Sequence, residues 1–143
     1  MIIRRECGGA RSEQTVEDLC AELAQARGQR ALAFASERMR LVVEFAQVVA
    51  KDQALRESIP LQVFSFWTRK GAIETMRKNF EERLPSSTLA VGRGVAFHLP
   101  PGNVDTIFLY SWVIAFLCGN VSVTRLPSVL GPTMERVLEV FSA

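Results

Sequence analysis

The chain has 143 residues, of which 48% are hydrophobic, enough for one ordinary domain and too few for two. Its 17 basic and 15 acidic residues leave a net charge of +2, and no basic run is interleaved with aromatic residues, so a dedicated nucleic-acid surface is not expected. Three widely spaced cysteines and one histidine predict neither a metal site nor a disulfide framework, which favours a reducing cytoplasm. The longest apolar run, Ile107 to Cys118, is too short to span a bilayer, so a soluble protein is expected.

The N-terminal part of the chain, residues 1–87, is predicted to be a helical region. Its first helix is expected over residues 12–26, where apolar residues recur at helical spacing. Thr15 and Asp18, three residues apart, resemble a capping box at the start of that helix.

Two further helices are expected in the same region. The first runs from about Arg30 to Lys51, and the second from Phe66 to Leu84, each with an apolar stripe. Pro60 is expected to interrupt the helical pattern between them. We interpret the many charges of the second of these helices as a solvated face.

From residue 88 onward the pattern changes to alternating strands and helices, which is typical of a βαβ unit. The expected elements in chain order are a short strand over Thr88–Val91, a strand over Val95–Leu99, a turn over Pro100–Asn103, an apolar helix over Val104–Cys118, a strand over Val121–Thr124 and a last helix after Gly131. The predicted fold is therefore α/β: N-terminal helices followed, over residues 88–143, by an incomplete Rossmann-like βαβα unit, in one structural unit.

Asn103 and Arg125 both follow predicted strands, where open parallel sheets bind their ligands. Asn103 is suited to cap the next helix, and spacing alone favours that role. Its other role is an amide donor directed at an oxyanion, and the unusual backbone of Pro100 to Gly102 favours that reading. Arg125 is suited to bind a phosphate with both ends of its guanidinium, although the local pattern slightly favours a surface Arg paired with a carboxylate.

The other reactive residue types point more weakly to chemistry. His98, on an apolar strand, is more often a buried histidine with satisfied nitrogens than an acid, base or ligand, and no Ser or Cys at a recognisable spacing completes a triad with it. Cys118 ends an apolar helix and is expected to be an inert thiol. A GxGxxG fingerprint after a strand and a Walker A motif are both missing from the sequence.

The stretch from Gly94 to Ser128 resembles the aldehyde dehydrogenase superfamily and, within it, the LuxC-type acyl-CoA reductases. Those proteins carry an H-x-x-x-G-N-V-P turn, which His98 to Val104 follows, except that Asp105 stands in place of the last Pro. They also carry a G-N-x-x-x-x-[KR] second strand, which Gly119 to Arg125 follows. Residues 12–84 fit the family's N-terminal region only loosely.

The resemblance implies NADPH-dependent reduction of a fatty acyl-CoA or acyl-protein thioester to an aldehyde. It places Asn103 at the oxyanion-hole amide and Arg125 at the cation that contacts the adenosine ribose. Ser128 falls where many NAD-preferring members have a carboxylate, so NADPH is favoured over NADH. The residues that would line the nicotinamide side of the cofactor cleft are Leu99, Pro100, Pro101 and Gly102.

In this superfamily the second Gly-rich loop, the general-base Glu and the nucleophilic Cys all lie after the residues that match here. None of the three cysteines present is placed to substitute for that nucleophile, so the chain alone is expected to be an inactive N-terminal part of such a reductase. Open sheet edges then predict self-association or pairing with a complementary C-terminal half. The alternative is a non-catalytic interaction or regulatory module that keeps the βαβ unit as a scaffold.

Overall fold

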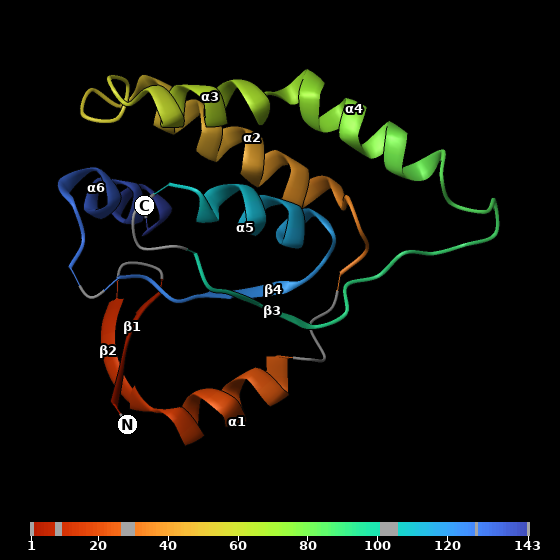
Figure 1. Ribbon diagram of the computed structural model, residues 1–143. Coiled ribbons are helices and arrows are strands. Elements are labelled where there is room, and N and C mark those ends of the chain that lie inside the picture. The colour runs from red at the N-terminus through yellow and green to blue at the C-terminus, as the bar shows by residue number, and fades with distance from the viewer. Residues whose placement is uncertain (1, 8–9, 27–30, 101–105, 128, 143) are drawn as a thin grey trace.

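The structure, a computed structural model, describes residues 2–7, 10–26, 31–100, 106–127 and 129–142 (Figure 1). Its elements in chain order are β1 (Ile2–Cys7), β2 (Ala10–Thr15), α1 (Val16–Ala26), α2 (Ser36–Lys51), α3 (Ile59–Trp67), α4 (Lys70–Glu81), β3 (Val95–His98), α5 (Phe108–Leu117), β4 (Val121–Thr124) and α6 (Pro132–Ser142). This is a mixed α/β chain, as predicted. Among the described helices, none combines the length and the apolar character needed to cross a membrane.

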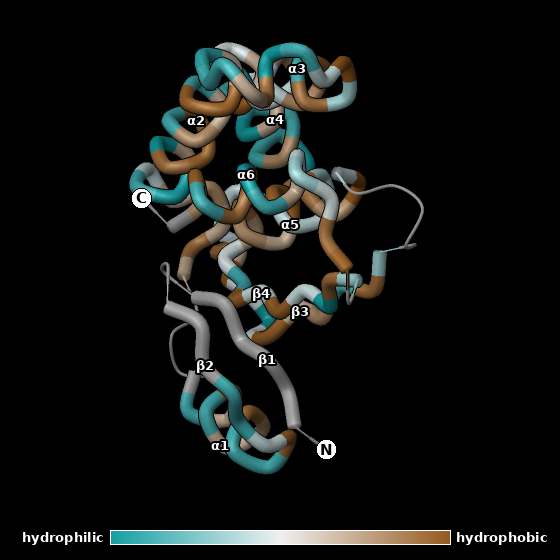
Figure 2. The backbone as a smooth tube through the Cα atoms, turned by 90° about the vertical axis from the view of Figure 1, so that its left-hand side faces the viewer, coloured by the Kyte–Doolittle hydropathy of each residue, from teal (hydrophilic) through white to brown (hydrophobic). Residues whose placement is uncertain are grey.

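The elements form layers around a small central sheet. Helices α2 to α6 stand on one side of the β3–β4 sheet, and the β1–β2 hairpin with α1 lies on the other side (Figure 1). The view turned by 90° shows the same order of layers (Figure 2). The apolar core therefore lies in the helical layer, above the sheet.

Helix α2 is the centre of that core, because it packs against α3, α4, α5 and α6. An aromatic cluster joins these helices: the ring of Phe45 on α2 lies 6.0 Å from Phe64 on α3, 5.9 Å from Trp112 on α5 and 4.2 Å from Phe141 on α6. Aromatic pairs at such distances add to the stabilisation from buried apolar area. The fully buried apolar side chains of the layer are Val42, Val49, Leu55, Leu61, Phe64, Ile73, Leu109, Val113, Leu117 and Val137.

An ion pair connects the end of α2 to α6. Asp52, the C-cap residue of α2, accepts hydrogen bonds from Nε and Nη2 of Arg136 at 3.0 and 2.8 Å. Its other carboxylate oxygen accepts from the backbone N–H groups of Ala54 and Leu55. These contacts lower the pKa of Asp52, with the hydrogen bond from Arg136 as the largest cause. The carboxylate therefore stays charged and fixes the turn that leaves α2.

Strands β3 and β4 form a parallel pair joined through α5. Val95 pairs with Val121 and His98 with Thr124, so the carboxyl ends of both strands meet at one edge. A parallel pair needs a crossover connection, and α5 packs against both strands as that connection. The predicted strand-helix-strand unit is confirmed at this level, with a two-stranded sheet in the described residues.

At the opposite end of these strands, three backbone segments meet in close contact around Gly92 and Gly119. The Gly92 N–H donates to the carbonyl of Ala31 at 3.0 Å, and the Ala31 N–H donates to the carbonyl of Gly119 at 3.3 Å. A Cβ at Gly92 would lie 2.1 Å from the Gly119 oxygen, and a Cβ at Gly119 would lie 2.1 Å from the Ala31 oxygen. Gly119 also has a φ of +86°, in the left-handed region that favours glycine. Only glycine fits at either position. We call this contact the glycine junction.

Two polar side chains hold the glycine junction in place. Asn120 accepts hydrogen bonds through Oδ1 from the N–H groups of Arg93 and Gly94, and donates through Nδ2 to the carbonyl of Ala115. From α2, Arg38 donates to the carbonyls of Phe116 and Asn120, both at 2.8 Å. Arg38 thereby ties α2 to the end of α5 and to the residue that precedes β4.

The N-terminal region differs from the prediction at its start. Residues 10–15 are not helical but form β2, which pairs antiparallel with β1 in a hairpin that the sequence did not reveal. Helix α1 begins only at Val16, yet the capping box is confirmed: the Asp18 N–H donates to Thr15 Oγ1, and Asp18 Oδ2 accepts from the Thr15 N–H.

The later helices also differ in their bounds. Helix α2 begins at Ser36 rather than near residue 30. Pro60 does not interrupt a helix but lies in the first turn of α3, where its missing N–H costs nothing. The helix expected over 66–84 is two helices, because α3 ends at the C-cap Thr68 and α4 begins at Lys70.

The segment expected as a strand over 88–91 contributes a single bridge. Leu32 pairs antiparallel with Val91, and no longer ladder forms in this described segment. The bridge is next to the glycine junction and belongs to the same crossing of backbone segments.

Substitution of either junction glycine tests how much the fold depends on this crossing. We predict that Gly119→Ala lowers the free energy of unfolding by about 2–4 kcal/mol, since it adds both a backbone strain and a clash. Gly71→Ala is the matched control, because a Cβ at Gly71, in the first turn of α4, meets nothing within 4 Å. That control should be neutral or stabilising by up to about 1 kcal/mol in urea unfolding. Equal effects at the two positions would contradict the role of the junction.

Candidate functional site

The carboxyl ends of β3 and β4 bring together those predicted site residues that the structure describes. The Arg125 N–H donates to the His98 carbonyl at 3.0 Å, which continues the parallel ladder past the end of β4. Leu99, the next residue after β3, therefore lies at the same edge as Arg125. The side chains of Leu99 and Arg125 are exposed, and Pro100 is half-buried. This edge is the candidate site.

Four predicted site residues lie outside the described residues: Pro101, Gly102, Asn103 and Ser128. One expectation for Asn103 can still be judged from the helix that follows it. Helix α5 has its N-cap at Ile107, four residues later, with no side-chain capping bond. The N-cap role for Asn103 is therefore wrong, because the helix expected from Val104 begins only at Phe108. Its oxyanion role stays a prediction.

Arg125 presents a guanidinium at the candidate site with which no described carboxylate forms an ion pair. In the described parts of the chain no carboxylate lies within ion-pair distance of it, so the paired surface Arg that the local pattern favoured is not observed there. Its side chain is exposed at the end of β4. A guanidinium in this state is able to bind a phosphate with two parallel hydrogen bonds.

His98 is held within the sheet. Its Nε2 lies 3.2 Å from Oγ of Ser122 on β4, and the ring is half-buried. Burial lowers the pKa of His98 below its ordinary value of 6.5, so the neutral imidazole is favoured at neutral pH. The contact and the burial fit the structural histidine that the sequence favoured.

Cys118 is not a nucleophile in this setting. The residue is half-buried at the end of α5, and burial raises the pKa of its thiol, which leaves it protonated at neutral pH. Among the described residues, no group of three His, Cys, Asp or Glu side chains could hold a metal ion.

Sequence reasoning missed the part that Asn120 plays. In the sequence the Gly119–Asn120 pair was recognised only as part of a family motif. In the structure the Asn120 side chain bridges the segment before β3 and the end of α5. An Asn directly after a glycine that ends a helix was the available signal, because both residue types favour such turns.

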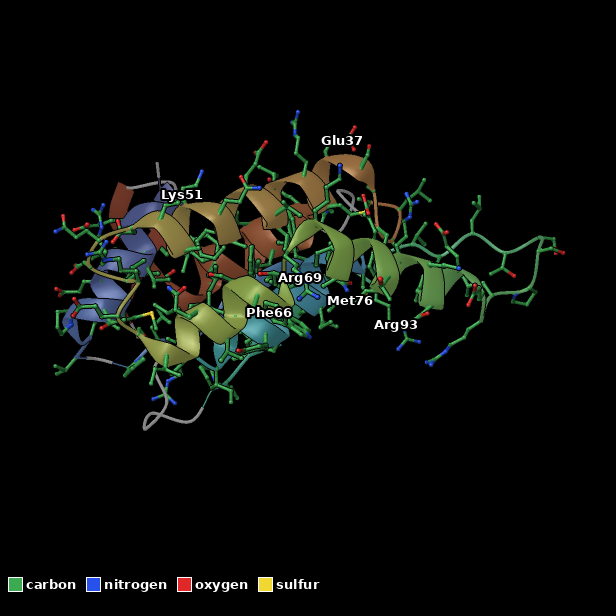
Figure 3. The ribbon with its side chains drawn as sticks, turned by 90° about the horizontal axis from the view of Figure 1, so that it is seen from above. Glu37, Lys51, Phe66, Arg69, Met76 and Arg93 are labelled. Atoms are coloured by element: carbon green, nitrogen blue, oxygen red, sulfur yellow. The ribbon has the colours of Figure 1, made fainter. Side chains whose placement is uncertain are left out.

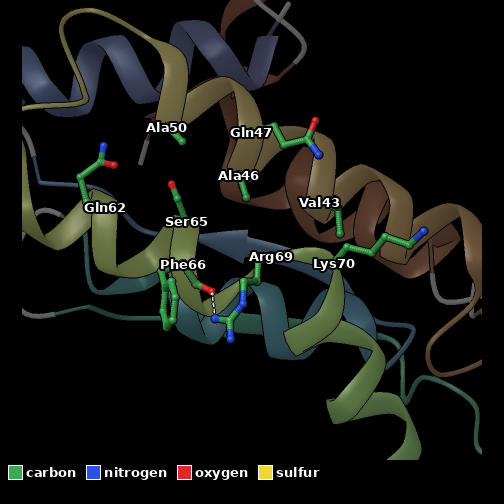
Figure 4. Close-up of a pocket in the computed structure, with 9 residues that line it drawn as sticks. All are labelled: Val43, Ala46, Gln47, Ala50, Gln62, Ser65, Phe66, Arg69 and Lys70. Carbon is green, nitrogen blue, oxygen red and sulfur yellow. Dashed lines mark hydrogen bonds between the residues drawn. The ribbon is translucent and has the colours of Figure 1, made fainter.

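A pocket of about 340 Å³ lies away from the strand ends, between α2, α3 and the start of α4 (Figure 4). Its floor is apolar, and Val43, Ala46 and Ala50 of α2 point across it toward α3. The other lining residues are Gln47, Gln62, Ser65, Phe66, Arg69 and Lys70. The sequence did not predict this pocket, since it depends on how two helices pack.

No protein-family model matches this chain, and no curated protein and no solved structure was found to match it either. The relation to LuxC-type reductases therefore remains a prediction from the motif residues.

The environment of His98 has a measurable consequence. We predict that an NMR titration of its ring protons gives a midpoint below 6.5. Because the folded-state pKa is depressed, the neutral His98 ring makes its full contribution to stability above pH 6.5. That contribution is lost as the pH falls through the folded-state pKa. In His98→Gln this part of the pH dependence should disappear. A midpoint at or above 6.5 would show that the ring is solvated or paired with a carboxylate.

Proposed function

We propose that this chain is the N-terminal part of a LuxC-like, NADPH-dependent acyl-CoA reductase, which converts a fatty acyl thioester to an aldehyde. Residues 88–143 contribute the first part of its cofactor-binding domain. The observation that carries the proposal is the meeting of Leu99, Pro100 and Arg125 at the carboxyl ends of two parallel strands, the edge at which open α/β sheets bind ligands.

Arg125 is the residue proposed to select the cofactor. An unpaired, exposed guanidinium suits the 2′-phosphate of NADPH, which NADH lacks. NADPH supplies a hydride when bound. Leu99 and Pro100 offer an apolar surface beside Arg125 for the nicotinamide side of the cofactor, and Pro101 and Gly102 continue that role by resemblance.

Two further roles rest on the resemblance alone. Asn103 is proposed to donate its amide N–H groups to the oxyanion that develops on the thioester carbonyl oxygen, an interaction of several kcal/mol in enzymes that use it. Ser128 is proposed to leave room for the 2′-phosphate, because a carboxylate there would repel it. The nucleophilic Cys of such a reductase is expected outside the residues present here.

A second candidate function is a non-catalytic interaction module. It is favoured by one observation: the pocket between α2, α3 and the start of α4 lies in the helical layer and is separate from the strand ends. In that case the βαβ unit serves as a scaffold, and the strand ends bind no cofactor.

A fluorescence titration with NADPH tests the first proposal. We predict saturable binding that weakens about 10- to 100-fold in Arg125→Ala, since a charge-assisted hydrogen-bond pair is lost. Arg125→Lys should keep part of the affinity, and the preference for NADPH over NADH should fall in both variants. Arg77→Ala is the matched control, because Arg77 is a partly exposed cation on α4, near Glu81.

Two results would count against the cofactor role. One is the absence of saturable NADPH binding, and the other is binding that Arg125→Ala leaves unchanged. Either outcome favours the interaction module.

A further inference from the structure

Helix α3 exposes an apolar stripe to solvent. Ile59, Val63 and Phe66 recur at i, i+4 and i+7, and their side chains are 76%, 54% and 66% exposed. The opposite face of the same helix, with Leu61 and Phe64, is fully buried. The helix contains no charged residue. Apolar side chains therefore lie on two opposite faces of α3, although only one of these faces has a partner in the described fold.

The pocket opens beside this stripe. Phe66 belongs both to the stripe and to the pocket rim, and the apolar side chains of α2 form the floor (Figure 4). An open pocket with an apolar floor next to exposed apolar side chains extends the apolar surface of this face. Such a patch on a protein surface marks an interaction site.

Arg69 fixes a positive charge at the same place. Its guanidinium lies 3.8 Å from the centroid of the Phe66 ring and donates to the Phe66 carbonyl at 2.7 Å. Viewed onto the outer face of α2, α3 and α4, Phe66 and Arg69 lie side by side (Figure 3). An Arg stacked on an exposed aromatic ring presents its charge and its apolar neighbour to the same partner.

The charged residues that line the pocket beside the stripe, Arg69 and Lys70, are both positive. Residues 51–70 contain four basic and two acidic side chains. The basic ones are Lys51, Arg56, Arg69 and Lys70, and the acidic ones are Asp52 and Glu57. Asp52 is already neutralised by Arg136, and Lys70 has only an exposed contact of 4.0 Å with Glu74. The partner of this face should therefore be anionic as well as apolar.

We propose that α3 docks this protein on the surface of an anionic lipid bilayer. Ile59, Val63 and Phe66 enter the boundary between headgroups and acyl chains, while Arg69 and Lys70 contact the phosphates. This is the arrangement of an interfacial helix, which lies on a membrane and does not span it. The proposal is independent of cofactor binding at the strand ends.

Charge favours a lipid surface over a second copy of this chain. A two-fold dimer pairs a surface with itself, so the cations beside each stripe would approach those of the other copy. An anionic bilayer instead neutralises all of these cations, and each basic residue adds to the free energy of binding.

Co-sedimentation of the full chain with vesicles tests the proposal. We expect binding to vesicles of phosphatidylcholine and phosphatidylglycerol in equal parts, little binding to phosphatidylcholine alone, and loss of binding at about 1 M NaCl. Val63→Ser with Phe66→Ser should reduce partitioning about tenfold or more. Arg69→Gln with Lys70→Gln should reduce it about fivefold per charge.

Matched controls separate this face from general exposure. Leu89→Ser with Val129→Ser removes apolar side chains that are as exposed, and Arg77→Gln with Lys78→Gln removes two exposed cations of α4. Both controls should leave binding unchanged within about twofold. Circular dichroism and thermal unfolding verify that every variant folds. If the Val63→Ser, Phe66→Ser variant does not fold, the Arg69→Gln, Lys70→Gln variant still tests this face.

Three outcomes would overturn the proposal. They are no binding to the anionic vesicles, equal binding by the α3 variants and the wild type, and a dimer in sedimentation equilibrium that Phe66→Ser dissociates while vesicle binding is absent. The last outcome would assign the stripe to a second copy.

Discussion

The contact between Gly92 and Gly119 is the constraint on which the rest of the structure depends. It lets three backbone segments cross within hydrogen-bond distance of one another: the approach to α2, the approach to β3 and the link between α5 and β4. Asn120 and Arg38 add side-chain hydrogen bonds to the backbone groups around this crossing. Any side chain at either glycine would push these segments apart, and the two strands would lose their common start. The junction and the strand register are thus coupled through the residues that directly precede β3 and β4.

The register in turn determines the chemistry available at the other end of the sheet. Because β3 and β4 are parallel and start together, His98 pairs with Thr124, and Leu99 and Arg125 emerge at the same edge. His98 itself contacts Ser122 and is half-buried, so it supports the sheet, and among the described residues Arg125 is the charged side chain at this edge. The helical layer carries a separate apolar face on α3, with its own cation at Arg69. The protein therefore offers two distinct surfaces: the strand-end edge with the exposed cation Arg125, and the exposed apolar face of α3.

The parts of the fold that the sequence predicts well are those fixed by local chemistry. The β-branched run Val121–Thr124 between turn residues, the Thr15–Asp18 capping box and the last helix are of this kind. The errors arise where tertiary contacts decide. β1 and β2 are rich in polar residues and are strands because they pair with each other, and Pro60 reads as a breaker although it also suits a first helical turn.

The residues of the candidate site also differ in whether the sequence alone could predict them. Arg125 could be named from its place after a strand, and Leu99 and Pro100 from the family resemblance, whereas the role of Asn120 and the groove between α2 and α3 depend on packing that no local pattern encodes. Amide chemical-shift mapping with NADPH tests the central claim, that the carboxyl ends of β3 and β4 bind the cofactor. We predict that the largest shifts fall on residues 98–99 and 124–126, with little change in α2 and α3. Shifts concentrated in the helical layer, or none at all, would contradict it.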